Sequence, residues 1–226
     1  MTRSERAAIL LARLPKIYPA AHCELNFSTP LELLVATILS AQCTDVQVNK
    51  VTPALFAAFP TAAAYASATQ EQVENLVKTT GFFRNKAKNI RVAARDIVEK
   101  YDGEVPRTLG ELVTLAGVGR KTANVVLGNA FGLDEGIVVD THVTRLSHRL
   151  KLTHKKDAEK IESDLVKLIP RQYWTIFSHW LIWHGRRRCT ARSPQCELCE
   201  LADFCPSARK FLSLIAPQTP QAVSSR

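Results

Sequence analysis

The sequence predicts an all-α fold. Helix-start signals recur along the chain, and segments with an apolar period of 3.6 residues follow them. Strand-like patterns are almost absent: Ile137-Val138-Val139 is the one β-like run, and it is too short to build a sheet. These observations together favour helices packed on helices, with no sheet.

The individual helices can be placed from their ends. At the amino terminus, the apolar positions Ala7, Ile9, Leu10, Leu11 and Leu14 suit one face of a helix. Capping boxes, in which a Thr precedes Glu or Gln by three residues, are predicted at 29–32, 69–72 and 108–111. Gly81 and Gly103 fall where helices should stop. Further helices are predicted near 87–101, 142–150, 155–168 and 172–184.

The composition indicates a globular protein with a polyanionic partner. The chain has 226 residues, 46% of them hydrophobic, and a formal net charge of +9. This length allows one large domain or two small ones, and the basic excess suits DNA, RNA or an acidic membrane surface. No targeting segment and no membrane span is visible, so we expect a cytoplasmic protein whose cysteines are reduced or metal-bound. The segment 211–226, rich in Pro, Gln and Ser, is expected to be a disordered tail.

Four of the six cysteines predict a metal centre. Cys189, Cys196, Cys199 and Cys205 form the pattern C-x6-C-x2-C-x5-C, and four thiolates so close can hold zinc or an iron–sulfur cluster. Structural zinc usually has two closely spaced ligand pairs, and only one is present here, which favours iron–sulfur. Two disulfides are disfavoured in a reducing compartment. Arg186, Arg187, Arg188 and Arg192 lie nearby and could either stabilise an anionic cluster or face phosphates. Cys23 and Cys43 have apolar neighbours and are expected in a core.

A glycine turn predicts a phosphate-binding hairpin. The segment Leu115–Gly119 lies between two helical segments, and its glycines, Gly117 and Gly119, permit a tight turn with positive φ. The backbone N–H groups at the start of the next helix can bind phosphate. Arg120 and Lys121 occupy that first turn, where the helix dipole disfavours cations. Lys121 is therefore either a phosphate contact, the simpler local interpretation, or a nucleophilic amine.

Asp140 follows the apolar run Ile137-Val138-Val139 and precedes Thr141-His142. This position is typical of a helix N-cap. A capping carboxylate is also held rigidly enough to accept a proton or to stabilise positive charge on a sugar.

Several of these motifs occur together in one order, and the whole resembles the endonuclease III family of bifunctional DNA glycosylases in the helix–hairpin–helix superfamily. The matching segments are LSAQCTD at 39–45, GFFRNKA at 81–87, LAGVGRKTA at 115–123, VDTH at 139–142 and the four cysteines. The resemblance covers residues 5 to 207 or so. It implies a six-helix barrel domain containing the hairpin, at 24–134, and an iron–sulfur domain formed by 1–23 and 135–210, with DNA bound between them.

The resemblance also implies the activity and the site. The expected enzyme removes oxidised pyrimidines from duplex DNA and cuts the strand 3′ to the abasic site by β-elimination. It would be a monomer whose partner is double-stranded DNA with a damaged base or an abasic site. Lys121 and Asp140 fall on the catalytic positions, the four cysteines on the ligands of a [4Fe–4S] cluster, and Asp45 and His142 on positions near the pocket. Gln42 and Phe82 fall on residues that fill the gap left by a flipped base, and the further expected DNA contacts are Gly117, Gly119, Arg120, Arg84 and Arg192.

Two positions depart from the family pattern. Ala116 replaces the usual hairpin proline, which should make the turn slightly less rigid, and Phe82 replaces a common leucine, which bears on the preferred opposite base. A monofunctional mismatch glycosylase is the nearest alternative, but it would lack the lysine at 121 and usually carries a further carboxy-terminal domain. A non-catalytic helix–hairpin–helix DNA-binding module is a second alternative, although it would not need this lysine and an aspartate.

Overall fold

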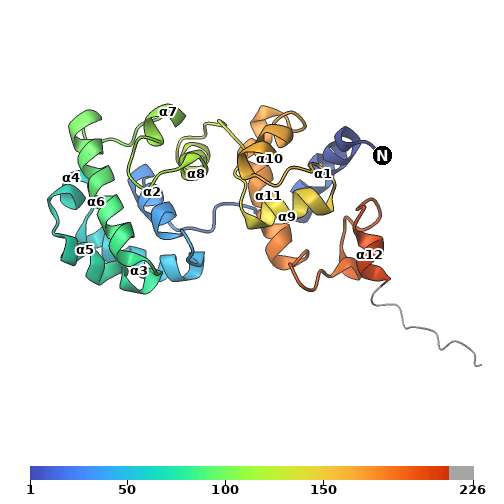
Figure 1. Cartoon of the computed structure of the whole chain (residues 1–226), viewed down its shortest axis with the longest axis horizontal. Coiled ribbons are helices and arrows are strands. Elements are labelled where there is room, and N and C mark those ends of the chain that lie inside the picture. Colours follow the sequence, from blue (N-terminus) through green and yellow to red (C-terminus); the bar gives the residue numbers. More distant parts are fainter. Residues whose placement is uncertain (214–226) are drawn as a thin grey trace, which may run out of the picture. The chain divides into compact units, whose positions relative to one another are not determined.

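The computed structural model describes residues 1–213, which fold into helices joined by loops, without a strand in this range (Figure 1). The predicted all-α class is confirmed. The chain forms two compact units. Residues 21–138 and 169–179 make up the first, called here the hairpin unit. Residues 1–20, 139–168 and 180–213 make up the second, called the cysteine unit, within the described range.

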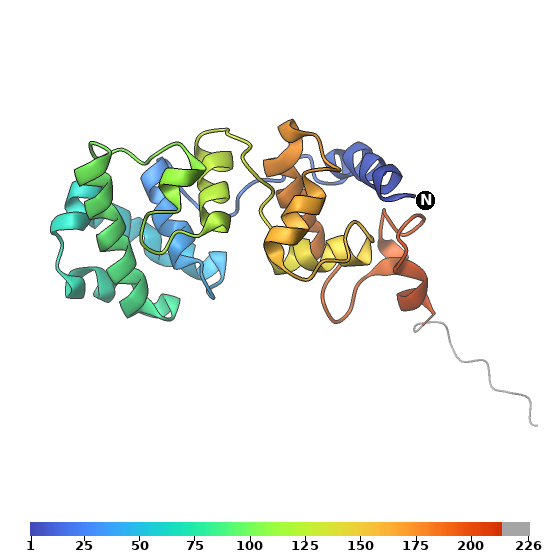
Figure 2. The same cartoon turned by 45° about the horizontal axis from the view of Figure 1, so that its top comes forward.

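The hairpin unit is a bundle of packed helices. Its helices are α2 (Pro30–Leu39), α3 (Asp45–Ala58), α4 (Ala62–Ser67), α5 (Gln70–Val77), α6 (Phe83–Lys100), α7 (Leu109–Leu112) and α8 (Arg120–Ala130), with the 3-10 turns η1 (Lys78–Thr80) and η2 (Arg171–Tyr173). Helix α6 packs against α2, α4 and α5, and α2 also packs against α8 (Figure 2). Ile90 and Ile97 of α6 and Leu33 and Leu39 of α2 are fully buried in this core. The apolar period of α6 thus places one face of the helix in the core.

Threonine caps set where the helices of this unit begin. The side chains of Thr29, Thr44, Thr61, Thr69 and Thr108 each accept a hydrogen bond from the backbone N–H three residues later. The box at 69–72 is complete, because the Gln72 side chain also bonds to the Thr69 N–H.

The other two predicted boxes, at 29–32 and 108–111, are only half formed. Glu32 instead accepts from the Ser28 N–H, one residue before the cap, and Glu111 accepts from the Thr108 hydroxyl. A glutamate three residues into a helix has several donors within reach, so the box pattern predicts the cap and not the reciprocal bond.

The cysteine unit holds α1 (Arg3–Ile17), α9 (Thr141–Arg149), α10 (Ala158–Leu165), η3 (Cys196–Leu198) and α12 (Ala208–Leu212). Helix α11 (Trp174–Arg187) begins in the hairpin unit and continues into this one. In α1, Ala7, Leu10 and Leu14 are buried as the sequence pattern predicts, whereas Ile9 and Leu11 are half-buried at the margin of the face.

The β-like run at 137–139 is buried but pairs with no strand within the described chain. The Val138 N–H donates to Ser178 Oγ at 3.0 Å, so a side chain satisfies the backbone group that a sheet would otherwise bind.

The segment 211–226, expected to be a disordered tail, is only partly described by the structure. Phe211 and Leu212 still belong to α12, while residues 214–226 lie outside the described range. In the described residues, no helix is both long and apolar enough to cross a membrane.

Candidate active site and cysteine centre

The predicted hairpin is a tight turn between α7 and α8. The Val118 N–H donates to the Leu115 carbonyl at 3.1 Å, and Gly117, third in this four-residue turn, has a φ of 78°. A positive φ at the third position is the mark of a type II turn, whose second position favours proline but does not require it. Ala116 holds that second position, which explains why the turn forms without the family's proline.

The two glycines of the turn have different roles. A Cβ on Gly117 would lie 2.9 Å from Cβ of Asn89, so both its φ and its packing against α6 exclude a side chain. Gly119 has an ordinary φ of −91°, which corrects the expectation of positive φ at both glycines, and a Cβ there would meet no atom within 4 Å. Because Gly119 is the N-cap of α8 and has no side chain, no side-chain cap binds the N–H groups of the first turn.

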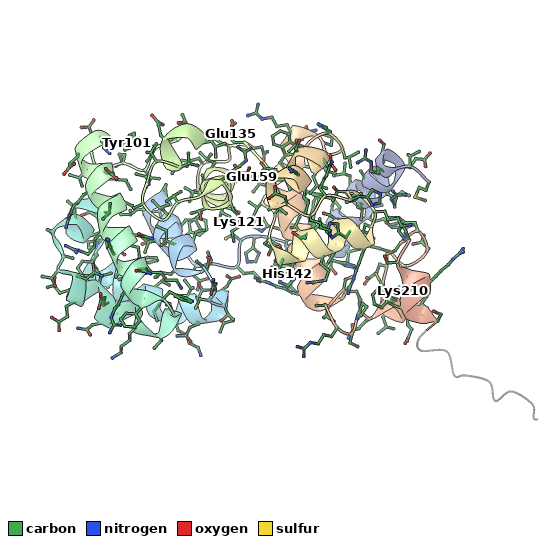
Figure 3. The ribbon with its side chains drawn as sticks, in the orientation of Figure 1. Tyr101, Lys121, Glu135, His142, Glu159 and Lys210 are labelled. Atoms are coloured by element: carbon green, nitrogen blue, oxygen red, sulfur yellow. The ribbon has the colours of Figure 1, made fainter. Side chains whose placement is uncertain are left out.

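Lys121 lies in this uncapped first turn of α8, and Figure 3 labels it there. Arg120 and Lys121 are both exposed. No acidic side chain lies in the first turn to offset the positive helix end. The turn thus presents backbone donors and two cations at one place, which is the chemistry that binds a phosphate backbone.

Asp140 is the N-cap of α9, as predicted. Its Oδ1 accepts a 2.8 Å hydrogen bond from the Val143 N–H, and its side chain is half-buried. The cap fixes the carboxylate at the helix start, and a rigidly held carboxylate is what general base catalysis or charge stabilisation requires.

His142, in the first turn of the same helix, is held by Arg145. The Arg145 guanidinium bonds to His142 Nδ1 at 3.1 Å and donates to the Gly185 carbonyl at 2.9 Å. Because a guanidinium only donates, Nδ1 accepts and the ring proton is on Nε2. A Cβ on Gly185 would lie 2.9 Å from this Nδ1, so the glycine permits α11 to approach α9.

Gln42 and Phe82 both adopt a left-handed backbone conformation. Gln42 has a φ of 52° and Phe82 a φ of 46°, and both side chains are exposed. Phe82 is 67% exposed, so its aromatic side chain contributes little to the core of the protein. Left-handed backbone is rare for a bulky residue and often marks a functional position.

The three other predicted contacts lie on the surface or at its edge. Asp45 is the first residue of α3, behind its Thr44 cap, and is half-buried. The Arg84 guanidinium lies 5.2 Å from the centre of the Phe83 ring at the start of α6. Arg192 is exposed in the loop between Cys189 and Cys196.

The four predicted cysteine ligands converge. Cys189, Cys196, Cys199 and Cys205 line one cavity of the cysteine unit, together with His184 and Arg149. All six cysteines of the chain are free, so none forms the disulfides of the alternative reading. Burial raises the pKa of the Cys196 and Cys205 thiols, and that of Cys199 to about 11. A cationic centre that binds all four sulfurs would offset this cost of ionisation, and the residues therefore fit a four-thiolate metal group.

Side-chain nitrogens contact two of the four sulfurs. Nη1 of Arg149, in the last turn of α9, lies 3.0 Å from Sγ of Cys189, and Nε2 of His184 lies 3.6 Å from Sγ of Cys199. The other ring nitrogen of His184 bonds to the Tyr18 hydroxyl at 2.9 Å. Donors of this kind stabilise anionic sulfur in metal and iron–sulfur sites.

Two of the arginines predicted to surround the cluster have other partners. The Arg187 guanidinium stacks 3.6 Å from the Trp183 ring centre, and Arg188 donates to Gln195 and Glu200. Arg149 and His184, which do approach the sulfurs, carried no local signal in the sequence. Both lie on helices that precede the cysteine loop, so only packing brings them to it. Cys23 and Cys43 were expected in a core, and they are half-buried at the margin of the core of the hairpin unit.

Two known protein families match segments of the chain. Residues 35–171 match the HhH-GPD superfamily of base excision DNA repair proteins. Residues 189–205 match the iron–sulfur binding domain of endonuclease III. The second match begins and ends on the first and last of the four converging cysteines.

Curated relatives are similar over nearly their whole length. Endonuclease III of Synechocystis is 57% identical over 208 residues, covering 92% of this chain and 95% of the relative. Endonuclease III of Bacillus subtilis is 44% identical, with 93% and 96% covered, and that of Escherichia coli is 44% identical, with 93% and 99% covered.

Solved structures agree with the sequence matches. A non-covalent endonuclease III–DNA complex superposes with a TM-score of 0.89 at 43% identity, covering 94% of this chain and all of that one. A trapped endonuclease III–DNA covalent intermediate gives a TM-score of 0.89 at 44% identity, with 94% and 100% covered. A thermostable thymine-DNA glycosylase, at 20% identity and a TM-score of 0.82, shares the fold.

Proposed function

Because the chain belongs to the endonuclease III family of base excision DNA repair proteins, we propose that Lys121 is the nucleophile of its reaction and Asp140 the assisting carboxylate. The protein is a DNA glycosylase with lyase activity at abasic sites, and its partner is duplex DNA carrying a damaged base or an abasic site. We propose that the damaged bases it removes are oxidised pyrimidines. We infer that it acts as a monomer in the cytoplasm, where its chromosomal substrate lies.

One observation carries the assignment of the nucleophile: Lys121 is exposed in the same uncapped first turn that offers N–H groups to a phosphate. DNA bound at that turn would have its sugar–phosphate backbone beside the amine. The damaged nucleotide has to leave the stack before the amine can reach C1′, and this costs less for a poorly stacked base.

In the reaction, the lone pair of Lys121 Nζ forms a bond to C1′ while the glycosidic bond breaks. The glycosidic electron pair leaves with the base, which takes up a proton. Asp140 would accept the proton lost by the amine or stabilise positive charge on the sugar. Opening of the sugar then gives a protonated Schiff base, which makes the C2′ proton acidic. Loss of that proton forms the C2′–C3′ double bond and expels the 3′ phosphate, which cuts the strand.

The cysteine centre fits the family's [4Fe–4S] cluster, with Cys189, Cys196, Cys199 and Cys205 as its ligands. When bound, the cluster would cross-link the segment 189–205 and fix its shape. Gln42 and Phe82 are proposed to enter the DNA stack at the lesion, and Gly117, Gly119, Arg120, Arg84 and Arg192 to contact phosphates. Asp45 and His142 are proposed to lie near the pocket for the flipped base.

Borohydride trapping tests the nucleophile, because reduction of a Schiff base links enzyme to DNA permanently. Wild-type enzyme should be trapped on a duplex with one abasic site, and Lys121→Gln should not be trapped. Lys88→Gln is the matched control, since Lys88 is an exposed lysine of the same unit. Equal trapping of Lys121→Gln and wild type would contradict the assignment, and a wild-type protein that shifts the duplex without nicking it would indicate a binding module.

A further inference from the structure

A buried ammonium group ties two exposed turns of the hairpin unit together. Lys86 lies near the start of α6 and is 5% exposed. Its Nζ donates to the Leu39 carbonyl at 2.8 Å and to the Thr80 carbonyl at 2.6 Å. Leu39 is the last residue of α2 and Thr80 the last of η1, so one side chain binds the ends of two segments that are distant in sequence.

Each of these segments is followed, within three residues, by an exposed residue with a left-handed backbone conformation. Gln42 follows Leu39 within a turn that the Cys43 N–H closes on the Ser40 carbonyl at 3.0 Å. Phe82 follows Thr80 after a single residue, Gly81. Lys86 is thus bonded at the base of both turns.

A buried lysine carries a desolvation cost that a purely structural contact at this position would not require. Burial disfavours the charged ammonium and lowers the pKa of Lys86. Helix-end carbonyls can be satisfied by water or by neutral side chains at a smaller desolvation cost. The three N–H donors of the ammonium allow it to bind two carbonyls from different segments at once. A second link, from Gln47 Nε2 to Thr79 Oγ1 at 2.8 Å, joins α3 to η1.

We propose that Lys86 is a positioning residue that holds Gln42 and Phe82 at the separation needed for both to enter the DNA stack at a lesion. This inference rests on the proposed function of those two side chains. Side chains already ordered before binding lose less entropy on insertion, so the tie should favour lesion-bearing over undamaged DNA. General affinity for phosphates should not depend on it.

The experiment compares Lys86→Met with Lys88→Met in the cluster-loaded enzyme. Lys88 is an exposed lysine two residues further along α6, so its replacement removes the same charge from the same helix. The probe is a duplex with an uncleavable tetrahydrofuran abasic analogue opposite 2-aminopurine, whose fluorescence rises when its stacking is lost. The preference for this duplex over an undamaged one should fall by about fivefold or more in Lys86→Met. Affinity for undamaged duplex should match that of Lys88→Met, and the fluorescence rise should shrink only in Lys86→Met.

Two further variants separate positioning from stability. Lys86→Arg keeps donors for both carbonyls and should recover part of the lesion preference. In a Phe82→Ala background, Lys86→Met should lower the preference little further, because Lys86 acts by positioning Phe82 relative to Gln42. A Lys86→Met protein with a lowered melting temperature but the wild-type lesion preference would overturn the proposal, and so would full additivity with Phe82→Ala.

If Lys86→Met does not fold, Lys86→Gln and Gln47→Ala carry the test. The first replaces the ammonium with a neutral amide on a shorter side chain. The second removes only the hydrogen bond between Gln47 and Thr79. Each should lower the lesion preference by about twofold, and unchanged preference in both would overturn the proposal. A failure of the proposed function would look different, because the wild-type enzyme itself would then neither prefer nor nick a duplex with an abasic site.

Discussion

The guanidinium of Arg149 donates a hydrogen bond of 3.0 Å to Sγ of Cys189 across 40 positions of sequence. The same side chain donates to the carbonyls of Thr190 and Ala191, both at 2.8 Å, and lies 4.8 Å from the Phe211 ring centre. Arg149 therefore joins the first cysteine, its following loop and α12. One side chain supports the geometry in which the four cysteines face a single cavity.

Replacement of Arg149 by Met should loosen the cluster without abolishing its assembly. Groups that orient metal ligands typically contribute about 10-fold to 100-fold in affinity, so cluster loss to an iron chelator should be roughly tenfold faster. The decay of absorbance at about 400 nm and the residual iron content measure this loss. Arg192→Met, an exposed arginine in the same loop, should behave as wild type. Equal rates for the two variants would show that the hydrogen bond to sulfur is dispensable.

The two hairpin glycines should separate folding from DNA binding. Gly117→Ala forces a side chain onto a φ of 78° and towards Asn89, which should lower the free energy of unfolding by about 1–3 kcal/mol. Gly119→Ala meets open space at an ordinary φ and should cost less than about 1 kcal/mol. Urea unfolding followed by circular dichroism measures both.

Affinity for duplex DNA, measured by fluorescence anisotropy over a range of salt, completes this comparison. Gly119→Ala should bind more weakly than wild type although it remains folded, because its methyl group adds bulk at the N-cap of α8, where the phosphate is proposed to bind. Wild-type affinity in Gly119→Ala would place the phosphate elsewhere.

His179 should make the stability of the protein sensitive to acid. Burial lowers the pKa of His179 to about 4, from 6.5, and its Nε2 donates to Asn129 Oδ1 at 2.7 Å. The folded protein thus binds fewer protons than the unfolded chain between these two values. Its stabilisation by neutral His179 is complete above pH 6.5 and is lost as the pH falls towards 4, by about 2 to 3 kcal/mol.

The free energy of unfolding of wild type and His179→Gln, measured from pH 7 to pH 4, tests this expectation. Glutamine retains a donor for Asn129 but does not titrate in this range, so the variant should lose less stability on acidification. His154→Gln alters an exposed histidine and controls for general effects of the substitution. Parallel pH profiles for wild type and His179→Gln would contradict the prediction.

Features that depend on nearby residues could be predicted from the sequence. The cap at Asp140, the full box at Thr69 and the positive φ at Gly117 arise from contacts within a few residues, so local patterns report them. The half-formed boxes and the ordinary φ of Gly119 show the limit of such patterns. A short motif gives the donors and acceptors available, and the surrounding backbone selects among them.

Features that depend on packing could not be predicted. Arg149 and Lys86 are ordinary cations in the sequence, and no periodicity distinguishes them from Arg187 or Lys88. Their roles follow from where helices α9 and α6 pack, which brings Arg149 to a cysteine sulfur and Lys86 to two helix ends. Long-range contacts of this kind are decided by the packing of whole helices and not by local preference.

The sequence by itself determined the all-α class, the helix starts, the hairpin, the four cysteines that converge on one cavity and, through its resemblance, the family. The helix class, helix starts and hairpin follow from short-range conformational preferences. The cysteine centre follows from the spacing of four cysteines, which restricts the ligands they can bind together. Only the tertiary structure decided which cations support the cysteine centre and the two left-handed turns at Gln42 and Phe82. A buried charge is retained only where the fold supplies its partners, and those partners come from segments that are distant in the chain.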